Sequence, residues 1–473
     1  MAIVAGVDRI LDPTFQVDDD ASSIRTALPP YTSRSGSSSA GEGSLSSYVF
    51  HLRNGKGRPW ATLKVKRALG SASSVRNLPI FVEGLPIVGS FSVDLEAPDP
   101  VRSVELIITG NITTAAHCND RLRFLDHRVC LWSDSTSCAT PLQGKHKWPF
   151  SVHLPREIVA MVSTQDGLIA SGLERTRVPQ PRLFRLPHTL MDRDSPVGVN
   201  YYIAIKVSRR RFHADSKLAT MISFYSATRP DPPSLLRQQS YKENQPILGP
   251  EIDSAGWQRC DPVKCRGRVF DDRMVEVECT LFVTKPLCFT RGTAIPLFLS
   301  IASHDRQALD LLRSPSWIKV QLRRHIRHTL DISGGSAPRK AVVTECGDAL
   351  WWPTQQEPSS TWTEDAACND RRMSSRTFAG ELRLSKFLQP SCETPYLAIT
   401  YTLSLQPFQR MAGFHPEDAS AFNESALVEV PVSIATLPAK GPPARCYSPP
   451  SYSEARDRAR KPGLWQATHA MMW

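Results

Sequence analysis

The sequence predicts an all-β protein made of two tandem β-sandwiches. Short runs rich in β-branched and aromatic residues recur along the chain, and Gly, Pro, Asn and Asp separate them. In residues 92–95 and 203–207, apolar side chains alternate with small or polar ones, as in a sheet with one buried and one wet face. The length of 473 residues exceeds what one ordinary core accommodates, so more than one folded domain is expected.

The first half of the chain is expected to hold an unfolded arm and the first sandwich. Residues 1–46 contain a stretch dominated by Ser, Gly, Thr and Pro, which buries too little apolar surface to fold, and they are predicted to be a disordered N-terminal arm. Residues 47–230 are predicted to form the first sandwich. Its expected strands are residues 48–52, 60–65, 87–95, 103–109, 150–154, 201–207 and 220–225.

The second half begins with residues 231–271, a polar and proline-rich stretch that is expected to be a linker or long loop. Residues 272–437 are predicted to form the second sandwich, with expected strands at 274–283, 294–301, 317–322, 377–384, 397–403 and 427–434. Helical periodicity is scarce, and the best short candidate spans residues 305–313. Residues 438–473 are predicted to be a disordered, proline-rich tail.

The net charge of +11 and the pI of about 9.2 favour acidic partners in general, such as phosphorylated peptide, anionic lipid or nucleic acid. The charge by itself selects none of these classes. Two clusters are candidates for contact with an anion or a lipid headgroup, and solvated strand edges are the alternative interpretation of both. The candidate residues are Arg209, Arg210, Arg211, Arg323 and Arg324.

Several classes of protein are not expected. The chain contains no stretch of the roughly 18 apolar residues that a membrane span needs, and its first residues lack the basic region and cleavage site of a signal peptide. The 11 cysteines are odd in number and dispersed, and only Cys260 and Cys265 form a close pair, which favours reduced thiols over disulfides or zinc. Because no catalytic motif has the required spacing, we expect neither an enzyme nor a cofactor or metal.

Nine segments, taken together in their order and spacing, carry a resemblance to a known family. The segment GKHKWPFSVHLP at 144–155 is similar to a strand of arrestin N-domains, and VNYYIAIKV at 199–207 to a later strand. The other segments are residues 89–95, 104–110, 131–132, 285–297, 317–322, 378–384 and 396–405. Together they resemble the arrestin superfamily, specifically the fungal α-arrestins and arrestin-domain-containing proteins. The resemblance covers about residues 48–436. It implies that the two sandwiches are immunoglobulin-like and form an arrestin fold.

A Pro-Pro-x-Tyr motif, the ligand of WW domains, occurs in the predicted tail at Pro449, Pro450 and Tyr452. The prolines pre-form a polyproline II helix, which lowers the entropic cost of binding, and the tyrosine fills a separate pocket. A weaker variant occurs in the N-terminal arm at Leu28, Pro29 and Tyr31. Two such sites on flexible tethers would bind a partner with several WW domains more strongly than one.

By resemblance, the chain is expected to be an adaptor that recruits a WW-domain-containing HECT ubiquitin ligase to plasma-membrane cargo for ubiquitination and endocytosis. Its partners would be the ligase, the cytoplasmic tails of membrane transporters or receptors, and an anionic membrane surface. It would be cytoplasmic and lie peripherally at the plasma membrane or endosomes.

Three alternatives stay open. The first is an arrestin-fold scaffold in vesicular sorting or signalling without ligase recruitment. The second is an enzyme or a carbohydrate-binding β-sandwich, for which Trp351, Trp352 and Trp362 could provide stacking surfaces. The third, immunoglobulin-like DNA binding, depends on the net charge alone, so nucleic acid is not an expected partner.

Overall fold

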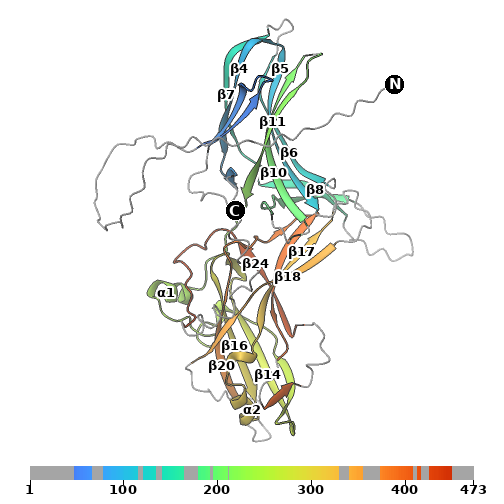
Figure 1. Cartoon of the computed structure of the whole chain (residues 1–473). Helices are drawn as coiled ribbons and strands as arrows, with labels where there is room; N and C mark the ends of the chain where they lie inside the picture. The colour runs from blue at the N-terminus through green and yellow to red at the C-terminus, as the bar shows by residue number, and fades with distance from the viewer. Residues whose placement is uncertain are drawn as a thin grey trace, which may run out of the picture.

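The structure, a computed structural model, has an all-β architecture with several sheets, compatible with a β-sandwich, and the predicted all-β class is confirmed. It describes residues 47–66, 78–114, 121–134, 141–163, 179–191, 195, 197–210, 212–329, 340–354, 373–408, 413–416 and 426–449. In Figure 1 the strands gather into an upper lobe, formed by the N-terminal half, and a lower lobe, formed by the C-terminal half.

The N-terminal half contains a four-stranded sheet, a five-stranded sheet and a two-stranded ribbon, with the orders β1-β2-β4-β7, β3-β11-β10-β5-β6 and β8-β9. In β4 the buried residues Ile87, Gly89, Phe91, Val93 and Leu95 alternate with more exposed ones, as the alternation in the sequence predicts. The strands are β1 (Ser47–Arg53), β2 (Pro59–Lys66), β3 (Ile80–Val82), β4 (Ile87–Asp99), β5 (Val101–Thr114), β6 (Arg121–Ser133), β7 (Leu142–Val152), β8 (Glu157–Ser163), β9 (Pro179–Arg185), β10 (Val197–Arg209) and β11 (Ser216–Tyr225).

The C-terminal half contains two larger sheets. In the first the order is β19-β20-β16-β14-β13-β23, with β12 paired to β14, and in the second it is β15-β24-β22-β17-β18, with β21 paired to β22. The strands are β12 (Trp257–Arg259), β13 (Val263–Val269), β14 (Arg273–Thr284), β15 (Cys288–Thr290), β16 (Ala294–Ser303), β17 (Val320–His328), β18 (Lys340–Asp348), β19 (Leu350–Pro353), β20 (Ser374–Arg383), β21 (Cys392–Glu393), β22 (Leu397–Leu405), β23 (Phe414–Pro416) and β24 (Val428–Ala435).

The helix expected at 305–313 is confirmed as α2 (Arg306–Leu311). The Asp305 carboxylate accepts a hydrogen bond from the Ala308 N–H at 3.0 Å and so caps the first turn. Two short 3₁₀ turns, Ser254–Gly256 and Pro315–Trp317, complete the helical elements of the described residues.

The stretch 231–271 is more structured than the expected linker. It contains α1 (Leu235–Glu243), whose N-terminus is capped by Ser234 and whose C-cap, Asn244, has a left-handed φ of 57°. It also holds β12 and β13, both paired with β14. The buried Arg237 of α1 donates a hydrogen bond to the carbonyl of Lys285. Tertiary contacts of this kind stabilise a short helix that the polar sequence does not predict.

The first residues of the expected C-terminal tail are also ordered. Residues 438–449 form hydrogen bonds with α1 and β20, so the expectation of disorder is wrong for this part of 438–473. Polar and proline-rich composition disfavours an independent core but does not prevent a segment from binding to a surface that is already folded.

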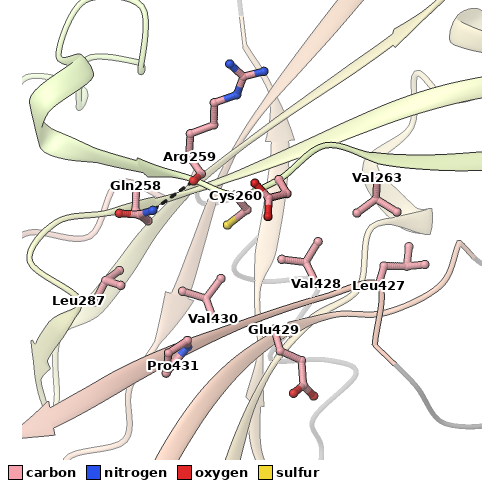
Figure 2. A pocket seen from close by; sticks show the side chains of 11 residues that line it. Gln258, Arg259, Cys260, Val263, Leu287, Leu427, Val428, Glu429, Val430 and Pro431 are labelled. Carbon is pink, nitrogen blue, oxygen red and sulfur yellow. Dashed lines mark hydrogen bonds between the residues drawn. The ribbon is translucent and has the colours of Figure 1, made fainter.

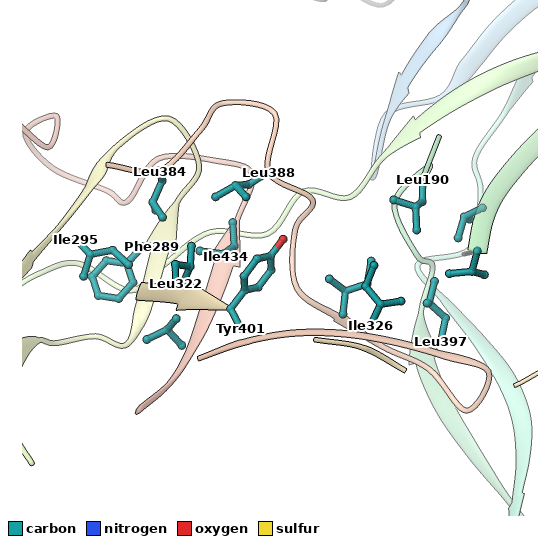
Figure 3. Close-up of a cluster of buried hydrophobic side chains, with 14 of the residues drawn as sticks. Leu190, Phe289, Ile295, Leu322, Ile326, Leu384, Leu388, Leu397, Tyr401 and Ile434 are labelled. Atoms are coloured by element: carbon teal, nitrogen blue, oxygen red, sulfur yellow. The ribbon is translucent and has the colours of Figure 1, made fainter. Parts of the chain in front are cut away.

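The two halves meet through apolar and polar contacts. In Figure 3, Leu190 of the N-terminal half points towards Ile326 and Leu397 of the C-terminal half, and all three belong to one continuous cluster of buried side chains. Nearby, the buried His188 ring packs edge-on against Tyr225 with the ring centroids 4.4 Å apart, and Arg291 lies over the same tyrosine. The junction of the halves is therefore a packed surface.

Close packing in the C-terminal half makes it sensitive to added volume at Gly380 in β20. A Cβ atom at this position would lie 2.4 Å from Cε3 of the buried Trp351. We expect Gly380→Ala to lower the free energy of unfolding by about 1–3 kcal/mol, since neither the ring nor the strand can move away easily. Urea unfolding followed by tryptophan fluorescence tests this, with Gly55→Ala as the control because no atom lies within 4 Å of a Cβ there. Equal midpoints for the two variants would contradict the packing argument.

The junction also predicts a pH dependence. Burial, and secondarily the positive charge of Arg291, lower the pKa of His188 from 6.5 to about 3. The folded protein therefore holds a neutral imidazole, and its stabilising contribution is present above pH 6.5 and is lost as the pH falls towards 3. We expect His188→Phe to lose less stability than the natural protein between pH 6 and pH 4, measured as the urea midpoint. Parallel pH profiles would show that His188 does not titrate in this way.

Candidate protein-interaction site

Residues 438–449, which we call the C-terminal strap, lie against α1. The Arg445 guanidinium donates from Nε to the Tyr241 carbonyl at 2.7 Å and from Nη1 to Asn244 Oδ1 at 3.1 Å. The Tyr447 ring stacks on the Tyr241 ring, with centroids 6.3 Å apart and planes 7° apart, and its hydroxyl donates to the Ser240 carbonyl at 3.1 Å. The strap thus covers the C-terminal end of α1.

A buried carboxylate of β20 binds the end of the strap. Glu381 is 3% exposed, and its Oε2 accepts the Tyr447 backbone N–H at 2.6 Å while Oε1 accepts the Ser448 hydroxyl at 3.1 Å. Arg383 donates from Nε to Glu381 Oε1 at 3.2 Å and from Nη2 to Ser448 Oγ at 2.7 Å. Hydrogen bonds with ionised partners are stronger than neutral ones. The chain is therefore fixed up to the residue before Pro449.

The two phenols and the thiol at the contact between strap and helix stay uncharged near neutral pH. Burial raises the pKa of Tyr241 to about 12 and also raises the pKa of Tyr447. Burial, and then the Glu381 charge, raise the pKa of the Cys446 thiol. Both phenols keep their protons, so the stacked rings meet as apolar surfaces.

The Pro-Pro-x-Tyr motif begins at Pro449, the last residue of the strap. Pro449 is the last described residue and is half-buried, whereas Pro450 and Tyr452 lie outside the described residues. The second predicted motif, at Leu28, Pro29 and Tyr31, also lies outside them. The motif can be found in the sequence. The sequence gives no sign, however, that Glu381 binds Tyr447, which lies 66 residues later and just before the motif.

A groove of about 450 Å³ opens beside the edge of β24 in the C-terminal half. Figure 2 shows Val430 and Pro431 of β24 on the side of the groove near Leu287, and Gln258 and Arg259 of β12 across from them. The lining residues are Gln258, Arg259, Cys260, Asp261, Val263, Leu287, Leu427, Val428, Glu429, Val430 and Pro431. The groove thus separates an edge of one sheet from a strand of the other.

Part of the β24 backbone at this groove pairs on one side only. Within the described residues, Val428–Val432 pair with β22 alone, and Ser433–Ala435 pair with β15. The Ser433 N–H donates to the Leu287 carbonyl at 2.8 Å, so by alternation Pro431 and Glu429 direct their backbone groups to the same side. Pro431 has no N–H, and a proline at a strand edge discourages uncontrolled pairing. The edge can accept a short extended segment.

Most arginines of the two basic clusters bind other side chains of the protein, although the sequence offered them as contacts for an anion. Arg209 lies 12% exposed and binds both carboxylate oxygens of Asp99, at 2.7 and 2.9 Å, with its guanidinium over the Trp60 ring. Arg210 pairs with Asp134 at 2.5 Å. The Arg209 guanidinium therefore faces the Asp99 carboxylate, which lies 110 positions earlier in the sequence, and is not presented to a membrane.

The second basic cluster lies on β17, in the interior of its sheet order. Arg324 is buried, and Arg323 donates to Gln406 Oε1 at 3.2 Å. Arg211 lies outside the described residues. Alternation along a strand that pairs on both sides directs every second arginine inward, which a count of charges in the sequence does not reveal.

The structure also bears on the tryptophans considered for carbohydrate stacking, on metal binding and on membrane spans. Trp351 is 3% exposed and packs on Gly380, so its ring offers no stacking surface to a sugar; Trp362 lies outside the described residues. Across the described part of the chain, no three His, Cys, Asp or Glu side chains gather as metal ligands. Within the same residues, no helix has the length and apolar character needed to cross a membrane.

No protein-family model matches the sequence, and no curated protein is significantly similar to it. The relation to arrestins therefore remains the resemblance of the sequence segments.

The ion pair of Arg209 gives a testable difference between structural and surface arginines. We expect Arg209→Ala to lower the free energy of unfolding by about 2 kcal/mol, because it leaves the half-buried Asp99 carboxylate without its main partner. Arg58→Ala is the matched control, since Arg58 and Glu96 are 74% and 69% exposed and such pairs contribute about 1 kcal/mol or less. Chemical unfolding of both variants tests this expectation. A smaller loss of unfolding free energy for Arg209→Ala than for Arg58→Ala would contradict it.

Proposed function

We propose that this protein is an adaptor that joins a WW-domain-containing HECT ubiquitin ligase to a plasma-membrane transporter or receptor. The observation that carries the proposal is that the Pro-Pro-Ser-Tyr motif begins at Pro449, the last residue of a strap that is fixed to the folded body through Tyr447 and Ser448. A ligase bound at this motif is held close to the C-terminal half. In this proposal the sheets form two immunoglobulin-like sandwiches of the arrestin type.

The chemistry of the motif fits WW-domain recognition. Consecutive prolines at 449 and 450 favour polyproline II, and Tyr452 stands at the position that fills the second pocket. The N-terminal variant at Leu28, Pro29 and Tyr31 would supply a second contact to a ligase with several WW domains. Transient recruitment needs only modest affinity from each motif.

The groove at β24 supports a role in cargo binding. An extended cytoplasmic tail could add to the strand edge at Glu429 and Pro431 through backbone hydrogen bonds, while the groove receives its side chains. Arg259 on one wall and Glu429 on the other would favour a peptide with charges of both signs. Such a protein would work in the cytoplasm, at the plasma membrane or endosomes.

The groove also supports a second candidate function, a scaffold in vesicular sorting or signalling without ligase recruitment. Peptide binding at β24 does not require Tyr452, so the groove would serve either function. The two candidates differ in whether the motif at Pro449 is used.

Binding of the full chain to the WW domains of a HECT ligase separates them. We expect micromolar binding that Tyr452→Ala weakens at least about tenfold, because the tyrosine pocket is left empty. Ser451→Ala is the matched control, since the third position of the motif is variable, and it should bind as the natural protein does. Equal binding by all three proteins, or none, would leave the scaffold function.

A further inference from the structure

The junction between strap and motif contains a serine followed directly by a proline, Ser448 and Pro449. Resting on the proposed function, we propose that Ser448 is a phosphorylation site that controls the motif. Phosphate at Ser448 releases the end of the strap from Glu381 and makes Pro449 and the residues after it accessible to a WW domain.

The Ser448 hydroxyl is bound in a site that a phosphate does not fit. Its hydrogen bond to Glu381 Oε1, 3.1 Å away, requires the hydroxyl proton, and phosphorylation removes that proton. A phosphoserine instead brings a charge of about −1.5 to −2 next to the carboxylate. Because Glu381 is almost fully buried, this repulsion is poorly screened by water.

Among the described residues, Arg383 is the cation that binds Ser448, and one arginine does not balance the added charge. It already donates to both Glu381 Oε1 and Ser448 Oγ, so a phosphate would share one guanidinium with the carboxylate. Arg445, the next cation along the strap, is engaged with Tyr241 and Asn244. One arginine between a carboxylate and a phosphate leaves a net negative charge, which favours release of the phosphorylated segment.

Release matters because of the space that a WW domain needs. A bound Pro-Pro-x-Tyr segment lies in an aromatic groove, so the domain must approach its prolines closely. Pro449 is half-buried and adjoins Ser448, which is held on Glu381 and Arg383. With the strap bound, only a fraction of the molecules offer a free motif, and the apparent affinity falls by that fraction.

The modification is an ordinary phosphoryl transfer. A protein kinase that requires proline after its target serine would transfer the γ-phosphoryl group of ATP to Ser448 Oγ. The new P–O bond forms as the bond to the departing ADP breaks, and the hydroxyl proton passes to the catalytic base of the kinase. Brief opening of the strap exposes the serine, and the phosphate then prevents reclosure.

The test compares the full chain with and without phosphoserine incorporated at position 448. We expect the phosphorylated chain to bind a HECT-ligase WW domain about five- to tenfold more tightly, the equivalent of one or two net hydrogen bonds. Hydrogen exchange at the Tyr447 amide, which Glu381 protects, should accelerate on phosphorylation. Phosphoserine at Ser314, an exposed serine that also precedes a proline, is the matched control and should change neither measurement.

Peptides spanning residues 444–455, with and without the phosphate, complete the design. Equal affinity of the two peptides, together with tighter binding by the phosphorylated chain, would support release of the strap. Unchanged exchange at Tyr447, or equal affinity of the two full chains, would overturn the inference. If the WW domain binds neither peptide, the proposed function fails and control of that binding fails with it, whereas faster exchange would still establish phosphate-driven release.

Discussion

Reciprocal hydrogen bonds between Thr228 and Thr436 bring the two ends of the C-terminal half together. The Thr228 N–H donates to Thr436 Oγ1 at 3.0 Å, the Thr436 N–H donates to Thr228 Oγ1 at 3.1 Å, and the Leu437 N–H reaches the Thr228 carbonyl at 2.8 Å. These bonds join the start of the connection between the halves to the end of β24, 208 positions later. As a result α1, which follows Thr228, and the strap, which follows Thr436, start from the same place and can pack together.

The strap contact is a compromise between strength and reversibility. A buried carboxylate is costly unless it is well hydrogen-bonded, and the strap provides Glu381 with two of its donors, the Tyr447 N–H and the Ser448 hydroxyl. The contact also includes one aromatic stack, the hydrogen bonds of Arg445 and Tyr447, and donation from Arg383 to Ser448 Oγ and from Arg229 to the Pro438 carbonyl. Binding that depends so strongly on one charged group can be reversed by one added charge, whereas a large apolar contact could not.

Two sites in the C-terminal half, Glu381 on the interior strand β20 and the one-sided part of β24, differ in how they are covered. At β20 the strap occupies the space beside Glu381, whereas among the described residues the β24 backbone from Val428 to Val432 pairs on one side only. Open edges invite further strands, and Pro431 limits this by removing a donor. In the C-terminal half the strap therefore covers Glu381, whereas the edge of β24 is available to a short extended partner.

The sequence by itself determined the all-β class, the alternating burial of β4, the short helix α2 and the Pro-Pro-Ser-Tyr motif, because each depends on side chains within a few positions of one another. Only the tertiary structure decided that Arg209 pairs with Asp99, that α1 forms in a polar stretch, and that the residues before Pro449 are ordered. In each of these cases the stabilising partner lies dozens to about two hundred positions away. Local periodicity specifies which face of a strand is buried, but only the packing of whole sheets selects the distant group that lies opposite.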